Sequence, residues 1–352
     1  MSRSKLQNLA ATAVQTLAAW AEKQVSCASI FGAASYEDKI YIDTVPLELS
    51  GGTAVELSLQ RLGLTPKRVN PGNRAETLCL NEYSLVFFNA HGDIGECGRL
   101  QGQLDLDHIP YTGSGVLASA ICLQKDTASS LARAFGLITP PQQLCWTVEE
   151  IRTAVESAND FVVVKPARGG SSVGVSIIEP GSASVASLPE LDDRQYLPAV
   201  VQDYIPGQDV TIGAIATSSE FLMLPPVSVR CKNELNFYGQ YEKMHAHWVG
   251  DVKYEVESAG FRKSEVLNEL LPSLLRACHI RGAVRADFRL ANDGVLHFLE
   301  INTSPGLSLQ GNLATAATAC GISFDELIAI LVASSAYDDP GSGKTTWLDS
   351  LD

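Results

Sequence analysis

The first third of the chain alternates between hydrophobic patterns that are typical of helices and of strands. A strand is predicted over residues 25–31 and a helix over residues 55–62. The continuous apolar run over residues 83–89 is typical of a strand buried on both faces of a parallel sheet. This alternation predicts an α/β domain with functional loops at the ends of its strands. An amphipathic helix is expected before it, over residues 4–22, with an apolar face formed by Leu6, Leu9, Ala10, Val14, Leu17, Ala18 and Ala21.

The remaining chain mixes further helices with strands that end in turn residues. Helices are predicted over residues 116–123 and 126–135, the second of which ends at Gly136 before a Pro-Pro pair. Thr147 begins a Thr-Val-Glu-Glu capping box, which predicts another helix start. The other predicted helices cover residues 264–278 and 323–335, and the predicted strands cover residues 160–165, 196–204, 210–216, 221–227, 283–290 and 296–301.

Two carboxylates and an amide lie at strand spacing near the C-terminal end. Asp287 and Glu300 lie in strands that flank an Asn-Asp-Gly hairpin turn, and Asn302 would share a face with Glu300. Oxygen ligands of this kind suit Mg²⁺. A solvated acidic face would also explain them, but the apolar flanking residues favour a cation site. Arg285, on the face of Asp287, would stabilise charge that develops on a transferred phosphoryl group or on a tetrahedral intermediate.

A glycine-serine loop follows a predicted buried strand. The strand ends in Lys165-Pro166, and the loop continues as Ala167-Arg168-Gly169-Gly170-Ser171-Ser172-Val173-Gly174. Backbone N–H groups and a lysine are suited to holding phosphates. A simple hairpin turn would explain the glycines, but not a lysine that is costly to desolvate without an anionic partner. With the magnesium ligands, this loop predicts a nucleotide-dependent phosphoryl-transfer site.

The amino-acid composition limits the classes of protein to which this chain can belong. The 352 residues are 45% hydrophobic and 19% charged, which is typical of a soluble globular chain with two or three domains. The net charge of −14 argues against non-specific binding of nucleic acid. Eight scattered cysteines without a CxxC pair favour a reducing cytoplasm. No membrane span is predicted, and the N-terminal helix is interpreted as an accessory helix, with a transit peptide as the alternative.

These residues belong to an ordered set that resembles the ATP-grasp superfamily, specifically its D-alanine–D-alanine ligase branch. The matching runs are Asn89-Ala90-His91-Gly92, Gly95-Glu96, Leu100-Gln101-Gly102, the run from Pro110 to Ala120, Lys125, the loop from Lys165 to Gly174, Arg285-Ala286-Asp287 and the run from Leu299 to Gly306. The resemblance implies a three-domain ligase fold of α/β and α+β parts with an extra N-terminal helix. The expected segments are an accessory helix (1–24), an N-terminal domain (25–115), central (116–204) and C-terminal (205–336) ATP-grasp subdomains, and a tail (337–352).

The resemblance also implies the roles of individual residues. The ATP site would comprise Lys125, Lys165, Gly169, Gly170, Ser171, Ser172, Val173, Gly174, Asp203, Tyr204, Ile205, Asp209 and Lys243. Asp287, Glu300 and Asn302 would hold two Mg²⁺ ions, for which Mn²⁺ could substitute. The catalytic residues would be Arg285, Gly306, Lys243 and Ser171, and the substrate positions would be His91, Glu96, Met244, Gly311 and Asn312.

The implied chemistry is ATP-dependent ligation of a carboxylate to an amine. ATP would phosphorylate the carboxylate of one amino acid, and the amine of a second would attack the acylphosphate and expel phosphate. A cytoplasmic homodimer that acts on amino acids is expected from the resemblance.

The chain departs from the family at the amino-acid side. The family's N-terminal Glu-Val-Ser-Leu motif is not recognisable within residues 35–49. Met244 replaces a tyrosine, Gly311-Asn312 replaces a Ser-Leu pair, and Gln202 replaces a hinge glutamate. We therefore expect a dipeptide ligase of specialised metabolism that uses L- or non-protein amino acids. The alternatives are a true D-alanine–D-alanine ligase of cell-wall synthesis and an inactive nucleotide-binding regulator, against which the retained Arg285 argues.

Overall fold

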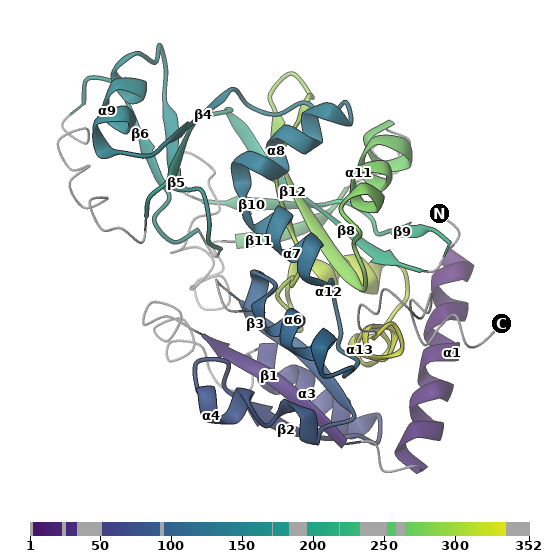
Figure 1. Ribbon diagram of the computed structural model, residues 1–352. Coiled ribbons are helices and arrows are strands. Elements are labelled where there is room, and N and C mark those ends of the chain that lie inside the picture. The colour runs from purple at the N-terminus through teal and green to yellow at the C-terminus, as the bar shows by residue number, and fades with distance from the viewer. Residues whose placement is uncertain are drawn as a thin grey trace.

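Three β-sheets organise the part of the chain that the computed structural model describes (Figure 1). That part comprises residues 3–22, 26–33, 51–91, 95–170, 172–182, 196–217, 219–232, 252–257 and 265–335. Each sheet lies inside one of the three segments expected from the sequence, whereas the segment boundaries remain predictions.

The first sheet is parallel and has the strand order β2-β1-β3. Its strands are β1 (Ser26–Ala33), β2 (Thr65–Val69) and β3 (Leu85–His91), and its helices are α3 (Gly51–Arg61), α4 (Arg74–Thr77) and α6 (Arg99–Leu106). Phe87 packs into the core that holds α3, and Phe88 packs into the core that holds α6. The apolar run of β3 is therefore buried on both faces of the sheet, as its sequence predicts.

The second sheet is antiparallel, in the order β4-β7-β5-β6. Its strands are β4 (Gln142–Cys145), β5 (Val162–Pro166), β6 (Ser176–Ile178) and β7 (Ala199–Asp203), and α9 (Val148–Glu156) packs on it. The predicted cap of α9 is confirmed, because the Thr147 hydroxyl accepts a hydrogen bond from the Glu150 N–H at 3.2 Å. The Glu150 carboxylate accepts from the Trp146 N–H rather than from that of Thr147.

The third sheet has six strands and forms one wall of the cleft described below. Its main path is β11 (Val252–Val256), β10 (Val227–Cys231), β8 (Gly207–Ala216), β12 (Ala283–Ala291) and β13 (Leu296–Asn302), and β9 (Phe221–Met223) pairs with β8. The helices that contribute to the core beneath it are α7 (Val116–Leu123), α8 (Lys125–Ala134) and α11 (Leu271–Ala277).

Two predicted elements of this third region differ in the structure. The strand expected over residues 221–227 is split into β9 and β10, because Pro225 and Pro226 have no N–H to donate to a sheet. The helix expected over residues 264–278 begins with a π-helical segment, Val266–Leu270, before α11. Pro272 in the first turn of α11 removes a donor from the regular helical ladder.

Helix α1 (Arg3–Glu22) packs along α13 (Phe324–Ala333) in a core that also includes residues of α3 and α12 (Asn312–Ala319). Its predicted apolar face is partly wrong: Val14 is 36% exposed, and Ala18 is exposed as well. The buried stripe follows alternating spacings of four and three residues, as expected where two helices lie side by side. The stripe consists of Leu6, Ala10, Ala13, Leu17 and Trp20.

Within the described residues, no single helix has the length and apolar character needed to cross a membrane, and only the bent pair α12–α13 meets these criteria together.

Candidate functional site

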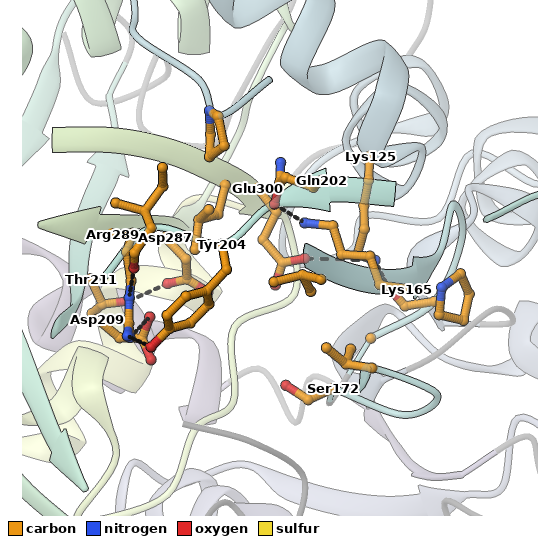
Figure 2. Close-up of a pocket in the computed structure, with 18 of the residues that line it drawn as sticks. Lys125, Lys165, Ser172, Gln202, Tyr204, Asp209, Thr211, Asp287, Arg289 and Glu300 are labelled. Atoms are coloured by element: carbon orange, nitrogen blue, oxygen red, sulfur yellow. Dashed lines mark hydrogen bonds and ion pairs between the residues drawn. The ribbon is translucent and has the colours of Figure 1, made fainter. Parts of the chain in front are cut away.

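A cleft between the second and third sheets holds most of the residues singled out in the sequence. It encloses about 1020 Å³ of empty space, open solvent included. Strands β5 and β7 and the glycine loop form one wall, and strands β8, β12 and β13 form the other. Figure 2 shows the two ends of the cleft, with Lys125, Lys165 and Ser172 at one and Tyr204, Asp209 and Arg289 at the other.

Two buried lysines create a cationic end. Lys125 begins α8, and its Nζ lies 3.6 Å from a carboxylate oxygen of Glu300. Lys165 in β5 donates a hydrogen bond to Oε1 of Gln202 at 2.9 Å. Gln202 in turn donates from Nε2 to Gln142 at 2.9 Å. The nearest hydrogen-bond partner of Lys165 is therefore a neutral amide, whereas Lys125 has a carboxylate beside it.

Burial is the main cause of an unusual pKa at Lys165. Desolvation lowers the pKa of this ammonium from 10.5 to about 8, the nearby Glu300 carboxylate opposes the change, and Lys125 adds to it. A charged lysine is thus held in an environment that disfavours its charge. An anionic ligand in the cleft would supply the missing counter-charge.

This lysine gives the stability of the ligand-free protein a predictable pH dependence. Because the folded-state pKa lies below the unfolded-state value, the unfolded chain binds more protons between pH 8 and pH 10.5, and stability rises with pH across that window. We expect the difference in unfolding free energy between Lys165→Met and the wild type to shrink by about 3 kcal/mol over this interval. Urea denaturation at a series of pH values would measure it. A difference that does not change with pH would contradict the burial argument.

The two acidic residues lie on adjacent strands of the predicted hairpin, and an irregularity in the ladder places them opposite each other. In the pairing of β12 with β13, Asp287 lies opposite Glu300, and Arg285 lies opposite Asn302. A bulge that the sequence did not indicate lies next to this pair, because Phe288 pairs with Phe298 and leaves Leu299 without a partner in the ladder. Leu299 and Glu300 both line the cleft as a result.

The donor set fits a divalent cation. Arg285 holds Asp287 through a bidentate ion pair, with Nε–Oδ1 and Nη2–Oδ2 distances of 2.9 Å, and the Thr211 hydroxyl also donates to Asp287. Oδ1 of Asn302 accepts from the backbone N–H of Ser304 at 2.9 Å. No group of three His, Cys, Asp or Glu side chains gathers anywhere in the described residues. Two carboxylates and an amide match a hard cation that takes its other ligands from phosphate and water.

The opposite end of the cleft contains an arginine that sequence reasoning missed. Arg289 in β12 is 4% exposed and contacts Asp209, Tyr204 and the carbonyl oxygen of Ile205. Its side chain shares a strand face with Arg285 and Asp287, because the three residues occupy every second position of the strand. A basic residue at that spacing in an otherwise apolar strand was the signal that could have identified it.

The glycine loop has the backbone geometry that its composition suggests. Gly169 has a φ of 123° and Gly174 a φ of 68°, values that favour glycine. A Cβ at Gly174 would also lie 2.9 Å from the ring of Tyr196. Gly169, Gly170, Ser172 and Val173 line the cleft, whereas Ser171 lies outside the described residues.

The positions expected to contact substrate are only partly brought together. A Cβ built on Gly170 would lie 3.1 Å from the Glu96 carboxylate, which places Glu96 beside the glycine loop. Asn312, the first residue of α12, lines the cleft, and Gly311 caps that helix. His91 ends β3. Gly306 is not one of the described residues that line the cleft, and Lys243 and Met244 lie outside the described residues.

Comparisons with known proteins agree with this arrangement. A family model described as the D-ala D-ala ligase C-terminus matches residues 135–333. The D-alanine–D-alanine ligase of Gloeobacter violaceus is 34% identical over 296 residues, which cover 81% of this chain and 93% of the relative.

Two solved structures share the fold at low sequence identity. D-alanyl-alanine synthetase A of Vibrio cholerae superposes with a TM-score of 0.72 at 20% identity, covering 88% of this chain and 97% of that one. The ATP complex of the Bacillus anthracis D-alanine–D-alanine ligase gives a TM-score of 0.67 at 23% identity, with the same coverage.

Proposed function

Because the chain belongs to the D-alanine–D-alanine ligase family and has its ATP-grasp fold, we propose that it is an ADP-forming ligase that joins two D-alanine molecules. The observation that carries the proposal is the cleft, which is lined by two buried lysines, a pair of carboxylates and the glycine loop. The expected specialised dipeptide ligase is not supported by the curated relatives, which favour the alternative reading as a D-alanine–D-alanine ligase.

ATP would lie along the cleft with its phosphates at the lysine end. Lys125 and Lys165 would contact the phosphates, and the glycine loop would cover them through its N–H groups. The electrostatics support this orientation, since Lys165 is a buried cation whose hydrogen-bond partner is neutral. Tyr204 and Ile205 would flank the base, and Asp209 would accept hydrogen bonds from the ribose hydroxyls.

Asp287, Glu300 and Asn302 would hold divalent cations between the two ends of the cleft, beside the phosphates. Bound there, Mg²⁺ would neutralise charge on the transferred phosphoryl group. The chain's own contribution is positional: Arg285 fixes the Asp287 carboxylate through a bidentate ion pair, and Lys125 lies beside Glu300. These contacts preorganise the carboxylates before the nucleotide arrives.

The reaction would proceed in two steps at this site. The carboxylate of the first D-alanine takes the γ-phosphoryl group of ATP and becomes an acylphosphate, with ADP as the leaving group. The amine of the second D-alanine then attacks that carbonyl carbon and phosphate departs. Arg285 would stabilise the charge that develops on the tetrahedral carbon's oxygen, and closure of the glycine loop would exclude water. A homodimer remains a prediction from the resemblance.

The identity of the residue at position 312 supports a second substrate class as the alternative. Asn312 is buried, lines the cleft and stands where the family resemblance leads us to expect a leucine. An amide at this position offers hydrogen bonds that an apolar side chain cannot, so an acceptor pocket formed here would have a different polarity. A dipeptide ligase that takes a polar or L-configured second amino acid is therefore the alternative substrate assignment.

Phosphate release from MgATP across pairs of D- and L-amino acids, with mass detection of the product, distinguishes these assignments. We expect D-alanine alone to support turnover and to yield the D-alanyl-D-alanine dipeptide. Turnover only with another pair would overturn the D-alanine assignment and identify the substrates. Absence of turnover with every pair would contradict the ligase proposal itself.

A further inference from the structure

Arg289 links β12 to two neighbouring parts of the cleft wall. Arg289 lies near the C-terminal end of β12, and its Nη1 is 3.1 Å from Oδ1 of Asp209 near the start of β8. Its Nε donates to the carbonyl oxygen of Ile205, and its Nη2 donates to the Tyr204 hydroxyl, both at 2.9 Å. The guanidinium also lies 5.4 Å from the centre of the Tyr204 ring. One buried side chain thus contacts both the segment between β7 and β8 and the first residues of β8.

Burying the Arg289 guanidinium and its carboxylate partner costs desolvation free energy, so we expect the geometry of these contacts to have a function. Desolvating a guanidinium and a carboxylate carries a penalty that their attraction repays only when further hydrogen bonds satisfy both groups. An apolar side chain at position 289 would fill the same space in the cleft wall without this desolvation cost. The planar, forked guanidinium instead fixes the relative positions of several acceptors at once, which a flexible ammonium or an apolar residue cannot do.

The position of these contacts links them to the nucleotide. Arg289 lies with Tyr204 and Asp209 at the end of the cleft opposite the two lysines (Figure 2). Its three partners are the residues assigned above to the base and the ribose. The ion pair leaves Asp209 with a defined carboxylate orientation, and the two hydrogen bonds hold Tyr204 and Ile205 against the same strand.

We propose that Arg289 is a positioning residue for the nucleoside half of ATP, acting through Asp209, Tyr204 and the Ile205 carbonyl rather than by contact with the phosphates. The inference rests on the proposed function, because it requires that the nucleoside occupies this end of the cleft. It assigns to Arg289 the orientation of the carboxylate that reads the ribose hydroxyls.

Binding of MgATP to the full chain, measured by titration calorimetry without amino acids, tests the inference. Arg289→Met should weaken ATP binding by roughly 10- to 100-fold, because a charged hydrogen-bonded contact is lost. Arg289→Lys should give an intermediate loss, since it keeps the charge but not the fork. Arg230→Met is the matched control, because Arg230 in β10 pairs with Glu255 at the exposed surface of the same sheet.

A ribose analogue separates positioning from a general loosening of the fold. Wild type should bind ATP roughly tenfold more tightly than 2′,3′-dideoxy-ATP, and this ratio should fall toward one in Arg289→Met. A merely structural defect would weaken both nucleotides equally and leave the ratio unchanged, which would overturn the inference. Unchanged ATP affinity in Arg289→Met would overturn it as well.

The same ATP-binding measurements also address a variant that does not fold and a wild-type protein that does not bind ATP. If Arg289→Met does not fold, Tyr204→Phe removes only the hydroxyl contacted by Nη2, and a roughly 2- to 10-fold weaker Kd for ATP is expected. Unchanged affinity in that variant would count against the inference. Failure of wild-type protein to bind ATP at all would overturn the proposed function first, and is distinguishable from an altered response of the Arg289 variants alone.

Discussion

Replacing Asp287 and Glu300 together by alanine is expected to abolish magnesium-dependent phosphate release, with kcat reduced by about 10³-fold or more. The two residues lie opposite each other on β12 and β13 and face the cleft, so the double change removes both carboxylates of the candidate cation site. A phosphate-release assay over a titration of Mg²⁺ measures the effect. Raising the Mg²⁺ concentration should not restore activity, because the ligands themselves are missing.

The fold should survive in a more conservative version of this variant. Asp287→Asn with Glu300→Gln preserves side-chain volume near Arg285 and Lys125 and keeps one acceptor oxygen at each position while removing both negative charges. Thermal unfolding should then give a cooperative transition close to that of the wild type. Glu255→Gln, an exposed carboxylate on β11, is the matched control and should retain full activity. Magnesium-dependent turnover that survived the double substitution would disprove the metal assignment.

Lys165→Met is expected to lower kcat/KM for ATP by roughly 10²- to 10³-fold, because the phosphates would lose a buried cationic partner. The same substitution should stabilise the ligand-free protein below pH 8, where the wild type carries a buried charge. Activity and stability therefore change in opposite directions. Steady-state kinetics in ATP, together with urea denaturation at pH 7, would measure both effects.

A variant with a damaged fold would not reproduce this result, because it would lose both activity and stability. Lys67→Met changes an exposed lysine on β2 and should leave the kinetics and stability near wild-type values. An active Lys165→Met variant would exclude a role for this lysine with the phosphates. An inactive variant that is also destabilised at pH 7 would show that the ammonium is not held at an energetic cost.

Local patterns in the sequence were sufficient for the parts of the site that depend on neighbouring residues. The Asn-Asp-Gly turn predicts the hairpin of β12 and β13, which brings the segments that contain Asp287 and Glu300 side by side, although the direct pairing of these two residues depends on the bulge at Leu299. The apolar run of β3 indicates burial on both faces, which Phe87 and Phe88 confirm. In these cases the interacting residues are close in sequence or repeat with a fixed period.

Features that depend on distant partners were not predictable in the same way. The buried stripe of α1 is selected by contact with α13, so Val14 is exposed although its sequence pattern favoured burial. The bulge at Leu299 changes which side chains face the cleft, and no local residue signals it. The contacts of Arg289 with Asp209, Tyr204 and Ile205 join residues about 80 positions apart.

The substrate was the least predictable part of the site. Departures from the family pattern at Gln202 and Gly311-Asn312 led to the expectation of a specialised dipeptide ligase, whereas the relatives favour the D-alanine alternative. Gln202 lies behind Lys165 and bonds to Gln142, so its identity bears on the nucleotide side of the cleft. Counting altered positions does not show which of them touches an amino acid.

The packing of α1 against α13 also has a consequence for how the chain is made. Roughly 300 residues separate the two helices, yet α1 buries its apolar stripe against α13. At typical rates of synthesis, the ribosome needs about 15 to 60 s to reach the second helix after it has completed the first. Throughout that time Leu6, Leu17 and Trp20 lack their final partner, so α1 is synthesised long before it can dock.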